Sequence, residues 1–119
     1  MGYNSPYINN SLSLPMIDTV DSPYIHTATS DNFNQVVIEN SHKGPVLVNF
    51  CSKKAGPCLR QYPILDKIIH KYNGLLLLVN IDTETEISIT KDYGIASVPT
   101  LKLYRDGEVH ETCHGYQSD

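Results

Sequence analysis

The chain has 119 residues, of which 40% are apolar and 18% charged, and nine basic against thirteen acidic side chains give a formal net charge of −4. This length corresponds to a single domain, and an acidic balance without a segregated basic segment argues against a nucleic-acid partner. The longest apolar run, Leu75–Val79, is far shorter than the roughly 20 residues of a membrane-spanning helix. We therefore expect neither a nucleic-acid nor a membrane partner.

Residues 1–26 differ in composition from the rest of the chain and are predicted to form a flexible or extended leader. Asn, Ser, Pro and Tyr dominate this segment, and Asp18 and Asp21 are its only charged side chains. Such a composition disfavours regular structure. The segment lacks a signal-peptide pattern, and three cysteines without such a signal favour free thiols and a cytoplasmic location.

The following residues, 27–119, are predicted to form one domain in which helices and strands alternate. A short helix is expected to start at Ser30 or Asp31, because both side chains are suited to cap it. Val46–Cys51 is a β-rich run between chain-breaking residues and predicts a strand buried on both faces. A longer helix is expected near Pro57, because proline is tolerated in the first turn of a helix.

The second half of the domain continues the alternation. Leu75–Ile81 predicts a second buried strand, and residues 86–93 predict a short helix that ends before Gly94. Thr100–Tyr104 and Val109–His114 are separated by an Asp-Gly turn and predict an antiparallel hairpin. This order defines an α/β fold with a mixed central sheet flanked by helices.

Seven short motifs spaced along residues 30–116 together resemble the thioredoxin family. They are Phe50, Gly56–Cys58, Tyr62–Asp66, Val79–Asp82, Tyr93–Ile95, Val98–Leu101 and Asp106–Glu108. The resemblance implies a thioredoxin-like fold, in which a further helix normally follows the last hairpin. That helix is missing here, so we expect a domain truncated at its C-terminus. The leader, a second copy of the chain in a homodimer, or a downstream domain is expected to cover the sheet face.

Thioredoxins reduce disulfides with a Cys-x-x-Cys pair, and the corresponding segment here is Ala55–Cys58. The resemblance places Ala55 where the attacking thiolate stands, and a methyl group cannot attack sulfur. The buried acid of the family corresponds to Asn49, which cannot titrate. The resemblance therefore implies a domain without dithiol disulfide reductase activity.

The peptide-binding groove is what the resemblance retains, beside a proline, Pro99, that is expected to follow a cis peptide bond. The carried-over groove residues are Lys54, Ala55, Gly56, Pro57, Ile81, Val98, Pro99, His114, Gly115 and Tyr116. The first hypothesis is therefore a protein-binding co-chaperone or adaptor module, with unfolded or extended protein segments or a chaperone as partners. The segment Ser52–Cys58 is similar to bacterial chaperedoxin-type proteins, in which helical repeats follow the thioredoxin-like domain.

The alternative hypothesis is a monothiol disulfide or glutathione oxidoreductase of cell redox homeostasis, with Cys58 as its catalytic residue at a helix start and Cys51 or Cys113 as an occasional partner. Cys51 and Cys58 are expected to lie too far apart for a disulfide, which requires a Cα separation of roughly 4.4 to 6.8 Å. On a strand, Cys113 points to the opposite face from His110 and His114, so these three cannot converge on a metal ion. No metal and no cofactor are expected.

Overall fold

The β-rich runs of the sequence assemble into one five-stranded mixed sheet. The structure, a computed structural model, describes residues 6–7 and 22–115. The strands are β1 (Ile25–Thr27), β2 (Val46–Cys51), β3 (Leu77–Asp82), β4 (Thr100–Arg105) and β5 (Glu108–His114), in the spatial order β1-β3-β2-β4-β5. Strands β1 and β2 both pair with β3 in parallel, whereas β4 is antiparallel to β2 and β5 to β4. The predicted α/β fold with a mixed sheet is confirmed.

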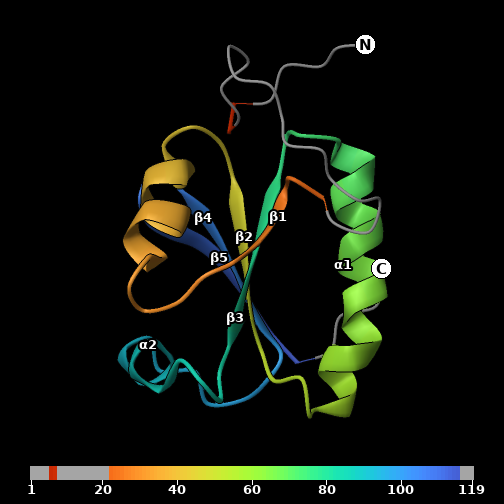
Figure 1. Ribbon diagram of the computed structural model, residues 1–119, viewed down its shortest axis with the longest axis vertical. Helices are drawn as coiled ribbons and strands as arrows, with labels where there is room; N and C mark the ends of the chain where they lie inside the picture. Colours follow the sequence, from red (N-terminus) through yellow and green to blue (C-terminus); the bar gives the residue numbers. More distant parts are fainter. Residues whose placement is uncertain (1–5, 8–21, 116–119) are drawn as a thin grey trace.

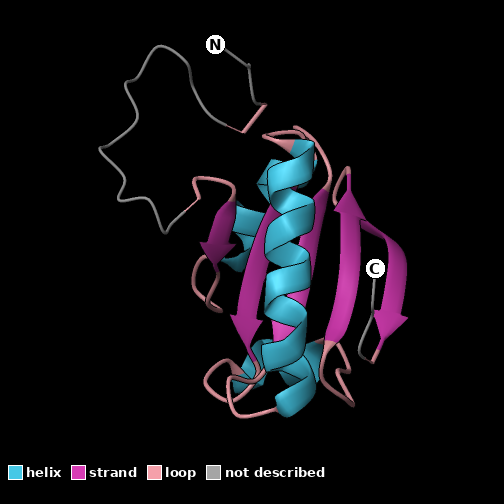
Figure 2. Ribbon diagram, turned by 90° about the vertical axis from the view of Figure 1, so that its right-hand side faces the viewer, coloured by secondary structure: helices cyan, strands magenta, loops and turns pink. Residues whose placement is uncertain are grey.

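Helices cover both faces of this sheet. Helix α1 (Gly56–Tyr72) lies on one face, and the short π-helix η1 (Asn34–Glu39) and helix α2 (Ile87–Asp92) lie on the other (Figure 1). Figure 2 shows α1 crossing the middle of the sheet, with β5 at the far edge. None of the helices in the described residues is long and apolar enough to span a membrane.

The side chains of β2 alternate between the two layers of the molecule. Val48 and Phe50 are buried in the apolar cluster that includes Phe33 and Val37 on the η1 side. A second cluster forms under α1 and contains Leu65, Ile69, Leu78 and Leu101. Because successive side chains of a strand point to opposite faces, Asn49 and Cys51 face α1. This alternation places the polar residues of β2 on the same side as the helix that follows it.

The β4–β5 hairpin confirms the expectation from the Asp-Gly pair. Asp106 and Gly107 both have positive φ, 54° and 81°, as the residues of type I′ hairpin turns do. All seven residues of β5 are exposed, and β5 is the last element in the described part of the chain. The expected truncation and the cover of the sheet face stay predictions, since residues 116–119 lie outside the described residues.

The first helix begins later than its expected caps at Ser30 or Asp31. The backbone N–H of Thr29 donates to Asn32 Oδ1 at 2.7 Å, so an Asn-closed turn occupies this stretch. Side chains of this kind compete for backbone groups and favour turns before a helix starts. Helix η1 therefore begins at Asn34, three to four residues further along.

Strand β1 was not predicted, and Ile25 and His26 fall within the segment assigned to the leader. The strand has only three residues, and its partner is β3, about 50 residues later in the chain, where Ile25 pairs with Leu78. A local pattern carries little information about such a distant partner. Tyr7 also contacts the cluster on the η1 side, and its hydroxyl donates to the Pro45 carbonyl. The rest of the predicted leader, residues 1–5 and 8–21, lies outside the described residues.

Candidate functional site

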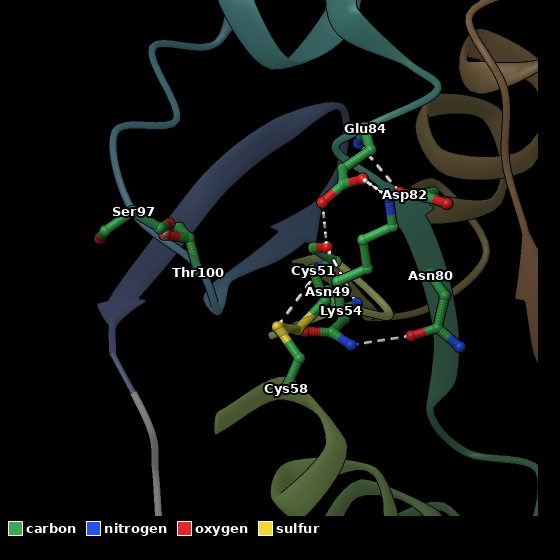
Figure 3. Close-up of a disulfide and its surroundings, with 10 residues drawn as sticks. Asn49, Cys51, Lys54, Cys58, Asn80, Asp82, Glu84, Ser97 and Thr100 are labelled. Atoms are coloured by element: carbon green, nitrogen blue, oxygen red, sulfur yellow. Dashed lines mark hydrogen bonds and ion pairs between the residues drawn. A yellow bond between two sulfur atoms is a disulfide. The ribbon is translucent and has the colours of Figure 1, made fainter. Parts of the chain in front are cut away.

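Two cysteines meet where strand β2 ends and helix α1 begins. Cys51 is the last residue of β2, and Cys58 lies in the first turn of α1, after Pro57. Their Cα atoms are 5.8 Å apart and a disulfide joins them (Figure 3). The expectation that they lie too far apart, and with it the expectation of free thiols at these two positions, is wrong.

The reason for this proximity is the tight connection between the two elements. The backbone N–H of Ala55 donates to the Ser52 carbonyl at 3.1 Å, so the chain reverses within four residues. Helix α1 consequently starts directly beside the end of β2 and brings its first turn back over Cys51. We call residues 52–55 the β2–α1 turn.

The disulfide is enclosed within the protein. Cys51 is 2% exposed and Cys58 is fully buried. The backbone N–H of Ser52 points at Cys58 Sγ, with 3.3 Å between nitrogen and sulfur. Both this N–H group and the start of α1 favour negative charge on that sulfur, whereas burial opposes it. Of the two cysteines, Cys58 thus has the surroundings that stabilise a thiolate.

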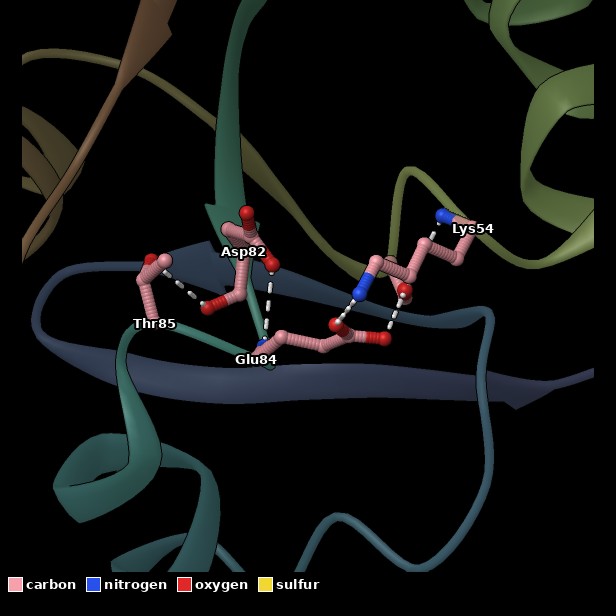
Figure 4. Close-up of polar contacts among 5 residues, drawn as sticks. Lys54, Asp82, Glu84 and Thr85 are labelled. Atoms are coloured by element: carbon pink, nitrogen blue, oxygen red, sulfur yellow. Dashed lines mark hydrogen bonds and ion pairs between the residues drawn. The ribbon is translucent and has the colours of Figure 1, made fainter.

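The Glu84 carboxylate, which follows the end of β3, contacts two residues of the β2–α1 turn (Figure 4). Ser52 Oγ donates to Glu84 Oε2 at 2.6 Å, and it accepts the backbone N–H of Lys54 at 3.1 Å. The Lys54 ammonium lies 3.5 Å from Glu84 Oε1. Asp82 Oδ1 in turn accepts the backbone N–H of Glu84 at 2.9 Å. This network holds the residues that cover the cysteines in place.

Two asparagines form a buried amide pair on the α1 side of the sheet. Asn49 and Asn80 are register partners on β2 and β3, and Asn49 Nδ2 donates to Asn80 Oδ1 at 2.9 Å. Asn49 has no exposed surface. Neither amide titrates, so this layer supplies hydrogen bonds without charge.

A cavity of about 480 Å³ opens beside this pair, at the carboxyl ends of the parallel strands. Its lining includes Lys53 of the β2–α1 turn, Asn80, Asp82, and Tyr62 of α1. Burial raises the pKa of Tyr62, and the negative charge of Asp82 raises it further. The phenol is therefore neutral at physiological pH.

The predicted groove residues come from two segments at the same end of the sheet, where Phe50 of β2 pairs with Thr100 of β4. Lys54, Ala55, Gly56 and Pro57 lie at the β2–α1 turn and the start of α1, whereas Val98, Pro99, His114 and Gly115 lie at the β4 and β5 ends. The peptide bond between Val98 and Pro99 is cis, as predicted, and the Pro99 carbonyl accepts the Gly115 N–H at 2.8 Å. Ile81 is 1% exposed and belongs to the apolar core, and Tyr116 lies outside the described residues.

A mixed sheet with a cysteine pair at the β2–α1 junction and a cis proline before β4 defines a thioredoxin-like protein. A comparison with known protein families supports this class, because residues 24–119 match the thioredoxin family. The chain belongs to the thioredoxin family.

Individual relatives agree with this assignment. The chain is 37% identical to thioredoxin 1 of Synechococcus elongatus over 87 residues, which cover 73% of this chain and 79% of the relative. It is 36% identical to a thioredoxin of Pyropia yezoensis over 91 residues, 76% of this chain and 83% of the relative. A thioredoxin of Pseudomonas aeruginosa is 33% identical over 91 residues, 76% of this chain and 82% of the relative.

These findings overturn the hypothesis of a binding module without redox activity. The relatives that match most of the chain are named thioredoxin. Ala55 stands where the first cysteine of the usual motif would be, yet Cys51 and Cys58 lie within bonding distance of each other. The sequence pattern made Cys51 at most an occasional partner of Cys58. The overlooked signal was a cysteine at the last position of a buried strand, directly before a tight turn that leads into a helix.

Proposed function

We propose that the protein is a thiol–disulfide oxidoreductase whose exchanging pair is Cys58 and Cys51. The observation that carries the proposal is the disulfide between them, with Cα atoms 5.8 Å apart at the start of α1. This function keeps the alternative hypothesis of a Cys58 oxidoreductase in cell redox homeostasis and makes Cys51, not Cys113, its regular second thiol.

In the reducing direction, the Cys58 thiolate attacks one sulfur of a substrate disulfide. A mixed disulfide forms, and the departing substrate thiolate takes up a proton. The Cys51 thiolate then attacks Cys58 Sγ, which forms the Cys51–Cys58 bond and releases the second substrate thiol. Two electrons and two protons thus pass from the cysteine pair to the substrate. Two molecules of glutathione restore the pair and become glutathione disulfide.

The surroundings of Cys58 favour its role as the attacking sulfur. A helix start and the Ser52 N–H both stabilise a thiolate at this position. We further propose that an extended segment of the substrate docks beside the cis bond before Pro99 and pairs with the backbone of Val98. Because both sulfurs are buried, the β2–α1 turn must move before a substrate disulfide can reach them.

The proposal includes a cytoplasmic location for the protein. A glutathione-rich cytoplasm supplies the reductant that the cycle needs. The likeness of the Ser52–Cys58 segment to chaperedoxin-type proteins extends the proposal to extended protein segments as substrates and to a helical-repeat domain downstream. Helical repeats encoded after this domain would support that extension.

Insulin reduction with glutathione as the electron donor tests the proposed function. Cys58→Ser is expected to abolish turnover, because it removes the attacking sulfur. Cys51→Ser is expected to lower turnover at least about tenfold and to accumulate a Cys58–glutathione adduct, visible by mass spectrometry, because no second thiol resolves it.

Cys113→Ser is the matched control, since Cys113 is exposed on β5 and has no disulfide. Its turnover is expected to equal that of the unmodified protein. Undiminished insulin reduction by Cys58→Ser, or no reduction by the unmodified protein, would show that the proposed function is wrong.

A further inference from the structure

One buried oxygen beside the cysteine pair has no hydrogen-bond donor. Asn49 is fully buried, and its Oδ1 atom is among the described side-chain atoms that lack a partner. A buried acceptor without a donor costs free energy, so it is unusual in a folded protein. A group that supplied a donor to this oxygen would remove that cost.

The other end of the same amide is fixed. Asn49 Nδ2 donates to Asn80 Oδ1 at 2.9 Å across the paired strands β2 and β3. In this bond the nitrogen of Asn49 faces Asn80 and its oxygen faces away from Asn80. Figure 3 shows this arrangement, with the oxygen on the side of the two sulfur atoms.

The sulfur atoms lie on the same face of the sheet as this oxygen. Asn49 and Cys51 are two residues apart on β2, so both side chains face α1, from which Cys58 projects. A disulfide has no proton to donate, whereas reduction creates at least one S–H group in this enclosed space, on Cys51 when Cys58 is the thiolate. Reduction therefore supplies a donor on the face toward which Asn49 Oδ1 points.

We propose that Asn49 is a positioning residue that favours the reduced form of the cysteine pair, by accepting a hydrogen bond from a thiol that exists only after reduction. The inference rests on the proposed function, because it concerns the redox equilibrium of the same pair. Asn80 contributes by holding the amide so that its oxygen, and not its nitrogen, faces the sulfurs.

The equilibrium in question is between the dithiol with glutathione disulfide and the Cys51–Cys58 disulfide with two glutathione molecules. As the protein disulfide forms, the two cysteines lose two protons and two electrons, the glutathione disulfide bond breaks, and two glutathione thiols are formed. Asn49 loses its donor in this direction. Its oxygen therefore opposes oxidation of the pair.

The experiment measures the oxidised fraction of the Cys51–Cys58 pair across a series of glutathione buffers. Free thiols are alkylated, and the masses of the products are measured by mass spectrometry. Asn49→Leu keeps the number and branching of the side-chain heavy atoms and has no acceptor. It is expected to shift the equilibrium roughly three- to tenfold toward the disulfide, which equals a reduction potential about 15 to 30 mV lower. Asn80→Ala, which frees the Asn49 amide to turn, is expected to shift it less in the same direction.

Ser41→Ala is the matched control for loss of a buried hydrogen bond. Ser41 is 1% exposed, and its Oγ accepts the Gly107 N–H at 2.8 Å, in a contact that involves neither β2 nor α1. This variant is expected to lose stability without moving the redox equilibrium, which separates a local effect on the cysteines from general destabilisation.

The outcomes test the role of Asn49 separately from the proposed oxidoreductase function. An unchanged equilibrium in both Asn49→Leu and Asn80→Ala, or a shift toward the dithiol, overturns the role of Asn49 and leaves the oxidoreductase intact. If Asn49→Leu does not fold, Asn80→Ala decides by the same criterion. Failure of the unmodified protein to form the disulfide at any glutathione ratio overturns the proposed function, and this inference with it.

Discussion

Ala55 places a methyl group at the start of helix α1, whereas the two sulfur atoms of the site are buried in the protein. Ala55 is the N-cap residue of α1, partly exposed, and its side chain makes no capping hydrogen bond. Cys51 and Cys58 are both buried. The resemblance to thioredoxins located the lost attacking thiol at position 55, but the chemistry depends on which sulfurs the folded chain brings together.

Ala55→Cys tests how much the burial of Cys51 and Cys58 slows the reduction of a substrate disulfide. A thiolate at position 55 lies at the helix N-terminus and is reached without moving the β2–α1 turn, so insulin reduction is expected to accelerate at least about tenfold. Ala55→Ser, with oxygen in place of sulfur, is the matched control and should leave the rate unchanged. Equal rates for Ala55→Cys and the unmodified protein would mean that access to sulfur does not limit turnover.

At the scale of elements, the β2–α1 turn is a short connection whose side chains are anchored elsewhere. Ser52 is 5% exposed and donates to Glu84, whereas the Lys54–Glu84 ion pair is exposed. Exposed ion pairs contribute little to stability, while a short hydrogen bond to a carboxylate contributes more. The Ser52–Glu84 bond is thus the contact that keeps the turn over the disulfide.

Glu84→Ala is therefore expected to expose the disulfide more often. Its reduction by dithiothreitol should accelerate roughly fivefold, as loss of one hydrogen bond allows. Lys54→Ala removes only the exposed ion pair and is expected to change the rate less than about twofold. The rates are measured as thiol release at a fixed dithiothreitol concentration. A Glu84→Ala rate equal to that of the unmodified protein would exclude the turn as the barrier.

Elements with strong local signals were predicted well. The run Val46–Cys51 is β2 as expected, and the Asp-Gly turn joins β4 and β5 as expected. Strand β3 begins at Leu77, two residues after the apolar run starts, because register with β2 and not apolarity sets its first paired residue. The short strand β1 was missed, since its partner lies far away along the chain.

At the scale of the whole molecule, the disulfide joins two elements of the central architecture. It links the most buried strand of the sheet to the helix that covers one face. A cross-link of this kind restricts the unfolded chain more than the folded one. The redox state of the site therefore affects the stability of the entire domain.

Reduction is expected to lower the free energy of unfolding by about 2 to 3 kcal/mol, given a loop that spans 7 positions of the sequence. Urea denaturation with and without a reductant measures the difference. Cys51→Ser supplies the control, because its stability should not respond to the reductant. A protein equally stable in both conditions would contradict a cross-link that constrains the unfolded chain.

Local patterns of apolar residues, glycines and prolines predicted the alternation of helices and strands and carried the thioredoxin resemblance, which in turn implied the cis bond before Pro99. The pairing of Cys51 with Cys58 and the direction of the Asn49 oxygen toward them followed from the folded arrangement alone. Both outcomes depend on the distance and direction between side chains of different elements. Those quantities are set by how a tight turn returns a helix onto a strand, and no spacing along the chain specifies them.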